Sequence, residues 1–262
     1  MLNYRIDGDG PPLLLLHGFG ISFNIWTNLT PLLRDHFTLV TVELPGIGLS
    51  PLPPDTSTSL SASLYLPAAV DALEALRAHL ALPRWDILSY SSGTRVAEAY
   101  LHSHAQRVSR AIFLCSAQTA SAKANGLRVA GLVDAHFPAL GNWVLSGWRL
   151  RFLIQLLGFN MQRDPRVPAW FREISSQPVD VLKATLRSLP DFGARPIVIP
   201  DHIPALFIWG SRDLITATPR HPSARDLIIP VTHAAPQTSP REVGEAIIQF
   251  LVLSSSNPEG MG

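Results

Sequence analysis

Short apolar runs alternate with segments of helical periodicity through most of the sequence, and this alternation strongly limits the possible folds. The apolar runs are 3–6, 13–16, 37–42, 85–88, 108–115, 205–209 and 226–229, and the helical segments are 25–33, 65–82, 94–104 and 241–253. Strands that alternate with helices over short loops form a mainly parallel sheet with helices on both faces. We therefore predict an α/β fold with a doubly wound, mainly parallel sheet of about 7–8 strands.

The stretch between the two halves of this pattern does not show the alternation of apolar runs and helical segments. Residues 118–200 are rich in Trp and Phe and contain no clear strand. We interpret them as a helical cap inserted over the active edge of the sheet. The predicted sheet domain then comprises residues 1–117 and 201–253, and residues 254–262 are expected to form a flexible tail.

Composition excludes several classes of protein. The 262 residues are 47% hydrophobic and 16% charged, and the net charge of +1 gives no reason to expect a nucleic acid partner. No apolar run approaches the roughly 20 residues that span a membrane, and no signal peptide is evident. The single cysteine, Cys115, lies in an apolar run and is expected to be a buried thiol. We expect a cytoplasmic globular protein.

Ser91 is the candidate nucleophile. It is the central residue of Ser89-Tyr90-Ser91-Ser92-Gly93, between a predicted strand and a predicted helix. A serine at such a corner presents its hydroxyl forward, with the first N–H groups of the helix behind it. The alternative is an ordinary helix N-cap, which serine also favours. Ser92 is a rival nucleophile, although it is not the central residue between the small residues Ser89 and Gly93.

A general base and an acid for this serine are found later in the chain. His233 follows the last predicted strand, and Asp213 follows the strand 205–209 on the adjacent loop. Ligands of such sheets bind where the parallel strands end, so both residues are expected beside Ser91. Asp213 could orient the imidazole of His233 and stabilise its charge. The rival acids Asp191, Asp201 and Asp226 do not directly follow a strand in the required order.

Two backbone N–H groups are candidates for an oxyanion hole. Ser92 follows the nucleophile at the start of the helix, and Phe19 lies in the loop His17-Gly18-Phe19-Gly20 after a strand. The glycines allow the backbone to approach a substrate oxygen closely. We expect His17 to brace this loop rather than to carry a proton.

These motifs, taken in order, resemble those of the α/β-hydrolase family with an inserted cap. The resemblance covers nearly the whole chain and rests on residues 17–20, residues 43–50, the corner at Ser91, Gly210-x-x-Asp213, and His233. It implies a Ser91–His233–Asp213 triad, in the chain order of that family. Within the family, the chain resembles small carboxylesterases and methyl ester esterases that act on acyl carrier proteins.

The sequence departs from the family pattern at several positions, none of which removes a catalytic atom. Ser89 and Thr94 flank the corner where glycines are common, and Glu43 replaces an aspartate. Ile47 replaces a common histidine, and Thr232 stands where glycine is common. Ser89 remains small enough for close contact between strand and helix, although the corner is more crowded.

The resemblance implies a serine hydrolase that cleaves a carboxylic ester through an acyl-enzyme, without a metal or an organic cofactor. The same residues would also serve a thioesterase, a lactonase, a carbon–carbon hydrolase or a perhydrolase. A ligand-binding protein without catalytic activity is an alternative of another class. The remaining histidines show no metal-ligand spacing with cysteine or acidic residues.

Substrate selection is expected to depend on the cap. Its aromatic residues suggest a hydrophobic acyl group, with Trp143, Trp148 and Phe152 as candidate substrate-binding residues. The cap has ten basic and five acidic residues, a net charge of +5, which leaves −4 for the rest. A basic rim of this kind could dock an acyl carrier protein; the alternative is a set of solvated arginines.

Overall fold

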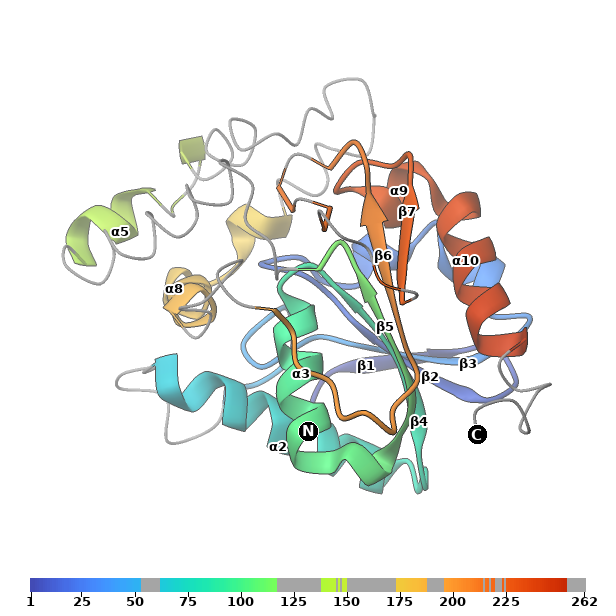
Figure 1. The fold of residues 1–262 in the computed structure, drawn as a ribbon. Helices are drawn as coiled ribbons and strands as arrows, with labels where there is room; N and C mark the ends of the chain where they lie inside the picture. Colours follow the sequence, from blue (N-terminus) through green and yellow to red (C-terminus); the bar gives the residue numbers. More distant parts are fainter. Residues whose placement is uncertain are drawn as a thin grey trace.

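One seven-stranded sheet forms the centre of the computed structural model (Figure 1). Its strands are β1 (Tyr4–Asp7), β2 (Pro12–Leu16), β3 (Thr38–Val42), β4 (Trp85–Tyr90), β5 (Val108–Leu114), β6 (Ala205–Gly210) and β7 (Asp226–Ile229). They lie in the order β1-β3-β2-β4-β5-β6-β7, and β1 pairs antiparallel with β3 while the other pairs are parallel. The predicted α/β class and mainly parallel sheet are confirmed.

The structure describes most of the chain. The described residues are 1–52, 62–116, 138–144, 146, 148–149, 173–187, 196–213, 215–216, 218–219, 223 and 225–253. No helix within these ranges is long and apolar enough to cross a membrane.

Helices cover both faces of the sheet, as the buried apolar runs require. On one face lie α1 (Thr30–Leu33) and α10 (Pro240–Leu253), and on the other lie α2 (Ala62–His79) and α3 (Gly93–His104) (Figure 1). In β2, Leu13 and Leu15 join the α1/α10 core, whereas Leu14 and Leu16 join the α2/α3 core. All four leucines are fully buried. Because successive strand residues point to opposite faces, a continuous apolar run is buried on both sides.

Several local elements differ from the sequence prediction, and α2 begins and ends three residues before the helix expected over 65–82. The helix expected over 25–33 is divided into a 3₁₀-helix η1 (Phe23–Trp26) and the short α1, because Pro31 lies in the first turn of α1 and favours a helix start there. Strand β4 extends through Ser89 and Tyr90, beyond the predicted end at residue 88. The Ser89 hydroxyl donates to the Ile112 carbonyl at 2.9 Å, so this polar residue is accommodated inside the sheet.

The long connection between β5 and β6 carries helices α5 (Pro138–Val144) and α8 (Val179–Arg187). β5 and β6 are neighbours in the sheet, so the chain leaves the sheet and returns to an adjacent position. Ile174 and Leu182 from this connection are buried in the α1/α10 core cluster. Figure 1 shows α5 and α8 on the side of the sheet away from α10. The cap boundaries at 118 and 200 remain a prediction.

Candidate active site

Ser91 occupies a sharp corner between β4 and α3. Its φ of 51° is positive, a conformation that non-glycine residues rarely adopt. The Ser91 N–H donates to the Leu114 carbonyl at 3.0 Å, and the Ser91 carbonyl accepts from the Thr94 N–H at 3.1 Å. The side chain is 6% exposed. Strain of this kind persists only where the surrounding structure fixes it, and it is concentrated at functional sites.

The corner is pressed against the loop that follows β2. A Cβ on Gly18 would lie 3.1 Å from the Ser91 Cβ, and a Cβ on Gly93 would lie 2.3 Å from the His17 carbonyl oxygen. Neither position has room for a side chain without movement of its neighbours. The two glycines therefore allow the candidate nucleophile and the candidate oxyanion loop to lie side by side.

Ser89 and Thr94, the two residues beside the corner that depart from the family pattern, each donate a hydrogen bond from their hydroxyl. Ser89 is bonded to the Ile112 carbonyl, as described above, and the Thr94 hydroxyl donates to the Ser91 carbonyl oxygen. Both residues are fully buried. A buried hydroxyl with a partner avoids the desolvation cost of an unpaired polar group. The crowding expected from these departures is thus compensated by hydrogen bonds, and the Thr94 bond also holds the corner itself.

Ser91, His233 and Asp213 form one chain of contacts. His233 Nε2 lies 3.0 Å from Ser91 Oγ, and His233 Nδ1 lies 2.8 Å from Asp213 Oδ2. Because the carboxylate is an acceptor, Nδ1 carries the proton and Nε2 is free to accept from the serine hydroxyl. All three side chains are buried. These residues come from the loops after β4, β6 and β7, as the sequence predicted.

Asp213 is held as a carboxylate. Its Oδ1 accepts from the Ile215 N–H at 2.7 Å and the Thr216 N–H at 3.0 Å, and its Oδ2 accepts from the Thr216 hydroxyl and His233. Burial on its own raises the pKa of Asp213, but the charge of His233 and these hydrogen bonds outweigh it and lower that pKa. The ionised acid can therefore orient His233 and stabilise a positive charge on it.

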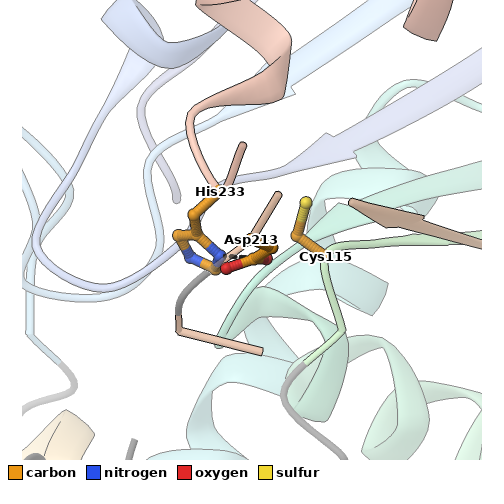
Figure 2. A group of neighbouring side chains, drawn as sticks. All are labelled: Cys115, Asp213 and His233. Carbon is orange, nitrogen blue, oxygen red and sulfur yellow. Dashed lines mark hydrogen bonds and ion pairs between the residues drawn. The ribbon is translucent and has the colours of Figure 1, made fainter. Parts of the chain in front are cut away.

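Cys115 and Tyr90 complete the surroundings of His233. Figure 2 shows the Cys115 thiol beside Asp213 and His233, with candidate ligand atoms of the three residues within 4.8 Å of one another. Burial, followed by the Asp213 charge, raises the pKa of the Cys115 thiol well above its usual range. A protonated thiol and a carboxylate that already accepts four hydrogen bonds are poor metal ligands. The Tyr90 hydroxyl donates to the His233 carbonyl at 2.8 Å.

His17 orients the peptide between Gly18 and Phe19. The Leu44 N–H donates to His17 Nε2 at 2.9 Å, so the proton is on Nδ1, which lies 2.8 Å from the Gly18 carbonyl oxygen. Burial lowers the pKa of His17 to about 4, although the Gly18 bond and the Glu43 charge act in the opposite direction. The carbonyl of Gly18 and the N–H of Phe19 point in opposite directions from one planar peptide. The bond to His17 therefore also fixes the direction of the Phe19 N–H.

The two candidate oxyanion donors are available. Among the residues that the structure describes, neither the Phe19 N–H nor the Ser92 N–H donates a hydrogen bond. Ser92 is the residue before the first turn of α3, where helix N–H groups are unpaired. Two free N–H groups on adjoining loops beside Ser91 are what an oxyanion hole requires.

Of the three predicted substrate-binding residues of the cap, Trp143 and Trp148 are exposed, and Phe152 lies outside the described residues. Trp143 is 56% exposed and Trp148 is 67% exposed, so each indole presents most of its surface to solvent. The Arg149 guanidinium carbon lies 4.6 Å from the Trp143 ring centroid and 5.6 Å from that of Trp148. Phe152 lies outside the described residues. A role for these side chains in substrate binding remains a prediction.

Comparison with known proteins agrees with this fold. The family described as the alpha/beta hydrolase fold matches residues 11–139, which include the candidate nucleophile and its corner. The sheet order and the positions of the loops above agree with that match. The protein has the α/β-hydrolase fold.

The chain is similar to a pimeloyl-[acyl-carrier protein] methyl ester esterase of Aeromonas hydrophila subsp. hydrophila, which is 29% identical over 93% of this chain and 96% of its own. A thermophilic esterase from Thermogutta terrifontis superposes with a TM-score of 0.70 at 23% identity, covering 96% of this chain and 93% of its own. An enol-lactonase from Burkholderia xenovorans superposes with a TM-score of 0.69 at 20% identity, covering 96% of both chains. The two structural likenesses support the fold alone.

Sequence reasoning missed several residues that shape this candidate site. Thr216 donates a hydrogen bond to Asp213, and Tyr90 donates one to the His233 carbonyl. Cys115 lies beside Asp213 and His233. Thr216 follows Asp213 by three residues, a spacing at which a hydroxyl can reach an acid in a turn. No local pattern marks Tyr90 or Cys115, because their partners are more than 90 residues away in the chain.

Proposed function

We propose that the protein is a serine hydrolase that cleaves a carboxylic ester through an acyl-enzyme. The proposal rests on one observation, the continuous contact from Ser91 Oγ to His233 Nε2 and from His233 Nδ1 to Asp213 Oδ2, at 3.0 and 2.8 Å. A serine hydroxyl is a weak nucleophile unless a base removes its proton as it attacks. The neutral His233, oriented by Asp213, is placed to do so.

In the first half of the proposed reaction, Ser91 Oγ attacks the ester carbonyl carbon while its proton passes to His233 Nε2. The negative charge that develops on the carbonyl oxygen is stabilised by the N–H groups of Phe19 and Ser92. One such donor is typically worth about 3 kcal/mol in the transition state. Collapse of the tetrahedral intermediate breaks the ester bond, and His233 returns the proton to the leaving alcohol.

In the second half, water takes the place of the alcohol. His233 removes a proton from the water as its oxygen attacks the acyl carbon of the Ser91 ester. The same two N–H groups stabilise the second oxyanion, and the proton on His233 returns to Ser91 Oγ as the carboxylic acid leaves. No step requires an electron donor, a metal or an organic cofactor.

A labelling and burst experiment tests this proposal. With a p-nitrophenyl ester, we expect a burst of p-nitrophenol equal to the enzyme concentration if deacylation is the slower half. A fluorophosphonate should label the protein covalently at Ser91. Ser91→Ala should abolish both signals, whereas Ser92→Ala should retain the label. A protein that neither turns over esters nor reacts with the probe would be a binding protein instead.

The name of the Aeromonas relative supports a narrower proposal about the substrate. That relative is named for a methyl ester carried on an acyl carrier protein, and the cap of this chain has a net charge of +5. We propose that the basic cap docks an acidic carrier that presents a hydrophobic acyl ester. Attraction between opposite charges would raise the rate of encounter with the carrier and leave the chemistry unchanged.

Paired substrates distinguish carrier docking from a solvated set of arginines. Replacement of Arg149 and Arg151 by alanine should lower kcat/KM for a carrier-bound ester and leave that for a p-nitrophenyl ester unchanged. Arg34→Ala removes one positive charge from the exposed end of α1, outside the cap, and serves as the control for each single replacement. Equal loss on both esters, or equal loss with Arg34→Ala, would contradict docking through the cap.

A further inference from the structure

Tyr90 precedes the candidate nucleophile in the chain, and its side chain reaches the loop of the candidate base. It is the last residue of β4, directly before Ser91, and it is fully buried. Its hydroxyl donates to the His233 carbonyl oxygen at 2.8 Å. Its ring centroid lies 5.3 Å from that of the His233 imidazole, with 41° between the ring planes. One side chain therefore lies against both the backbone and the imidazole of His233.

The Tyr90 ring also lies against the loop after β2 that carries the candidate oxyanion donor Phe19. A Cβ on Gly18 of this loop would lie 3.1 Å from Tyr90 Cδ1 and 3.1 Å from Tyr90 Cε1. Trp26 of η1, which is 1% exposed, packs edge-on against the ring, with centroids 6.2 Å apart and planes at 76°. A ring enclosed by several neighbours is held in one rotamer by close packing. Tyr90 is therefore a rigid support for the groups around it.

The hydrogen bond between Tyr90 and His233 has a fixed direction. Burial raises the pKa of Tyr90 well above its usual range, so the hydroxyl keeps its proton. A backbone carbonyl can only accept, and a buried carbonyl that loses its donor is costly. The bond is therefore retained over the whole pH range in which a histidine titrates.

The chain that follows His233 is held separately. Helix α9 (Ala235–Thr238) begins two residues after His233. Asn28 Nδ2 donates to the Gln237 carbonyl of this helix at 2.8 Å, and Gln237 is buried. That bond positions α9, whereas the bond from Tyr90 acts on His233 itself. The Tyr90 bond therefore links the candidate base directly to β4, the strand that carries the nucleophile.

A link between base and nucleophile is useful because proton transfer requires a short and well-aligned contact. Ser91 and His233 are 142 residues apart in the chain, and their contact is 3.0 Å. They follow different strands, so a small shift of one loop would lengthen this contact. Tyr90 is covalently next to Ser91 and hydrogen-bonded to His233. A shift at the end of β4 therefore moves the nucleophile together with the anchor of its base.

We propose that Tyr90 is a positioning residue, whose hydroxyl holds the backbone of His233 so that Nε2 stays within reach of Ser91 Oγ. Tyr90 is fully buried, so it presents no surface to a substrate and acts only through His233. This inference rests on the serine hydrolase reaction proposed above. It adds that the base is positioned from the strand of the nucleophile.

Tyr90→Phe removes the hydroxyl and keeps the ring. Because His233 serves both halves of the reaction, we expect acylation and deacylation of a p-nitrophenyl ester to slow by similar factors. The fall in kcat should be at least about tenfold, since misplaced catalytic groups lose rate steeply with distance. KM should be unchanged, because no contact with the substrate is lost and the two halves slow alike.

Tyr100→Phe is the matched control for a merely structural effect. Tyr100 is also fully buried, and its hydroxyl donates to Glu74 Oε2 at 2.7 Å, in the α2/α3 core. This variant should lose stability in urea unfolding, as Tyr90→Phe does, and keep the wild-type kcat. The rates are compared at a temperature at which all three proteins are folded. An unchanged kcat in Tyr90→Phe, or an equal fall in Tyr100→Phe, would overturn the inference.

A nuclear magnetic resonance measurement tests the positioning without turnover. The Nδ1 proton of His233, bonded to Asp213 at 2.8 Å, should give a far-downfield signal that is absent from His233→Gln. We expect this signal to broaden or disappear in Tyr90→Phe, because a mobile imidazole exchanges its proton with water, and to persist in Tyr100→Phe. A wild type that cleaves no ester would contradict the proposed reaction, and this comparison would still decide whether Tyr90 fixes His233. An unchanged signal in Tyr90→Phe would overturn the inference in either case.

Discussion

At the scale of single residues, the site depends on a few buried groups whose protonation and direction are fixed by neighbours. Ser91 has a positive φ that its own side chain disfavours, and it is held there by its N–H bond to the Leu114 carbonyl and by the bonds that Thr94 donates to its carbonyl. His233 has one tautomer because Asp213 accepts from Nδ1. His17 has one tautomer because Leu44 donates to Nε2. Substitutions at these positions should therefore act through orientation as much as through chemistry.

Asp213→Asn tests the role of the acid with almost no change in side-chain size. The amide can donate to Nδ1, which would favour the wrong tautomer of His233 and leave Nε2 protonated. We expect kcat for a p-nitrophenyl ester to fall on the order of 10⁴-fold, as in other triads that lose this group. Asp226→Asn is the matched control, since Asp226 bonds to Trp209 and Ser223 instead. A comparable loss with Asp226→Asn would contradict the assignment of Asp213.

His17 should make the stability of the fold depend on pH. Its pKa is about 4 in the folded protein and 6.5 in an exposed histidine, so the folded state binds fewer protons between these values. Stability is therefore complete above about pH 6.5 and falls as the pH decreases toward 4, by up to about 3 kcal/mol. Urea unfolding at pH 7 and pH 4.5 should show a smaller loss in His17→Gln than in the wild type. Equal losses in the two proteins would assign the acid sensitivity to other groups.

At the scale of elements, the site is produced by the close approach of β2, β4 and α3. The first residue of α3, Gly93, lies against the carbonyls of Leu16 and His17 at the end of β2. This contact places the start of the helix, with the free N–H of Ser92, beside the loop of Phe19. The two candidate oxyanion donors are thus close because a glycine allows a helix and a strand end to meet.

Gly93→Ala should separate these elements. The added Cβ would lie 2.3 Å from the His17 carbonyl oxygen, a distance that requires the backbone to move. We expect a loss of about 2–3 kcal/mol in the free energy of unfolding, typical of overpacking, together with loss of esterase activity. Gly244→Ala in α10 is the control, because its nearest neighbour is Leu32 Cδ1 at 3.4 Å. That variant should gain up to about 1 kcal/mol in helix propensity.

Much of the element pattern could be predicted from sequence. The predicted and observed strands agree to within two residues, because hydrophobic periodicity and turn residues are local signals. The helix expected over 25–33 was wrong as one element, since Pro31 starts a new helix within it. The end of β4 was predicted too early, because a polar residue such as Ser89 usually marks the end of a buried strand. In the structure its hydroxyl donates to the Ile112 carbonyl in the neighbouring strand, so Ser89 remains within β4.

At the scale of the whole molecule, a buried ion pair fastens the chain where it returns from the cap connection to the sheet. Arg95 Nη1 and Glu98 Oε2 are 2.9 Å apart in α3, with side chains only 4% and 3% exposed. The other oxygen of Glu98 accepts from the Val198 N–H at 2.9 Å. Ile197 and Ile203 of the same returning segment are buried in the α2/α3 core. The pair therefore joins a helix of the sheet domain to the segment before β6.

Glu98→Leu should lower the free energy of unfolding much more than replacement of both Arg95 and Glu98 by apolar residues. It leaves the Arg95 guanidinium buried without the Glu98 carboxylate, and we expect a loss of about 3–5 kcal/mol in the free energy of unfolding. Arg95→Met combined with Glu98→Leu removes both charges and should recover most of that loss. Urea unfolding of the wild type, both single variants and the double variant gives the coupling energy. Additive losses would show that the two side chains act independently.

The sequence by itself determined the fold class and the order of Ser91, Asp213 and His233 along the chain. Both follow from local signals, namely periodicity and the position of polar residues directly after strands. It also indicated the two loops that carry the candidate oxyanion donors. Local patterns suffice there because parallel strands deliver their following loops to one edge of the sheet.

Only the tertiary structure decided which distant groups meet, and in what state of protonation. Glu43 is 130 residues from Glu173, and in the sequence it was only a departure from a family pattern. In the fold, Glu43 is a buried acceptor for Asn3, Ser22 and Leu49, and burial raises the pKa of Glu173. Burial and the arrangement of donors act through space, at separations that no local pattern can encode. The physical chemistry of Glu43, Glu173 and Cys115 is therefore a property of the fold.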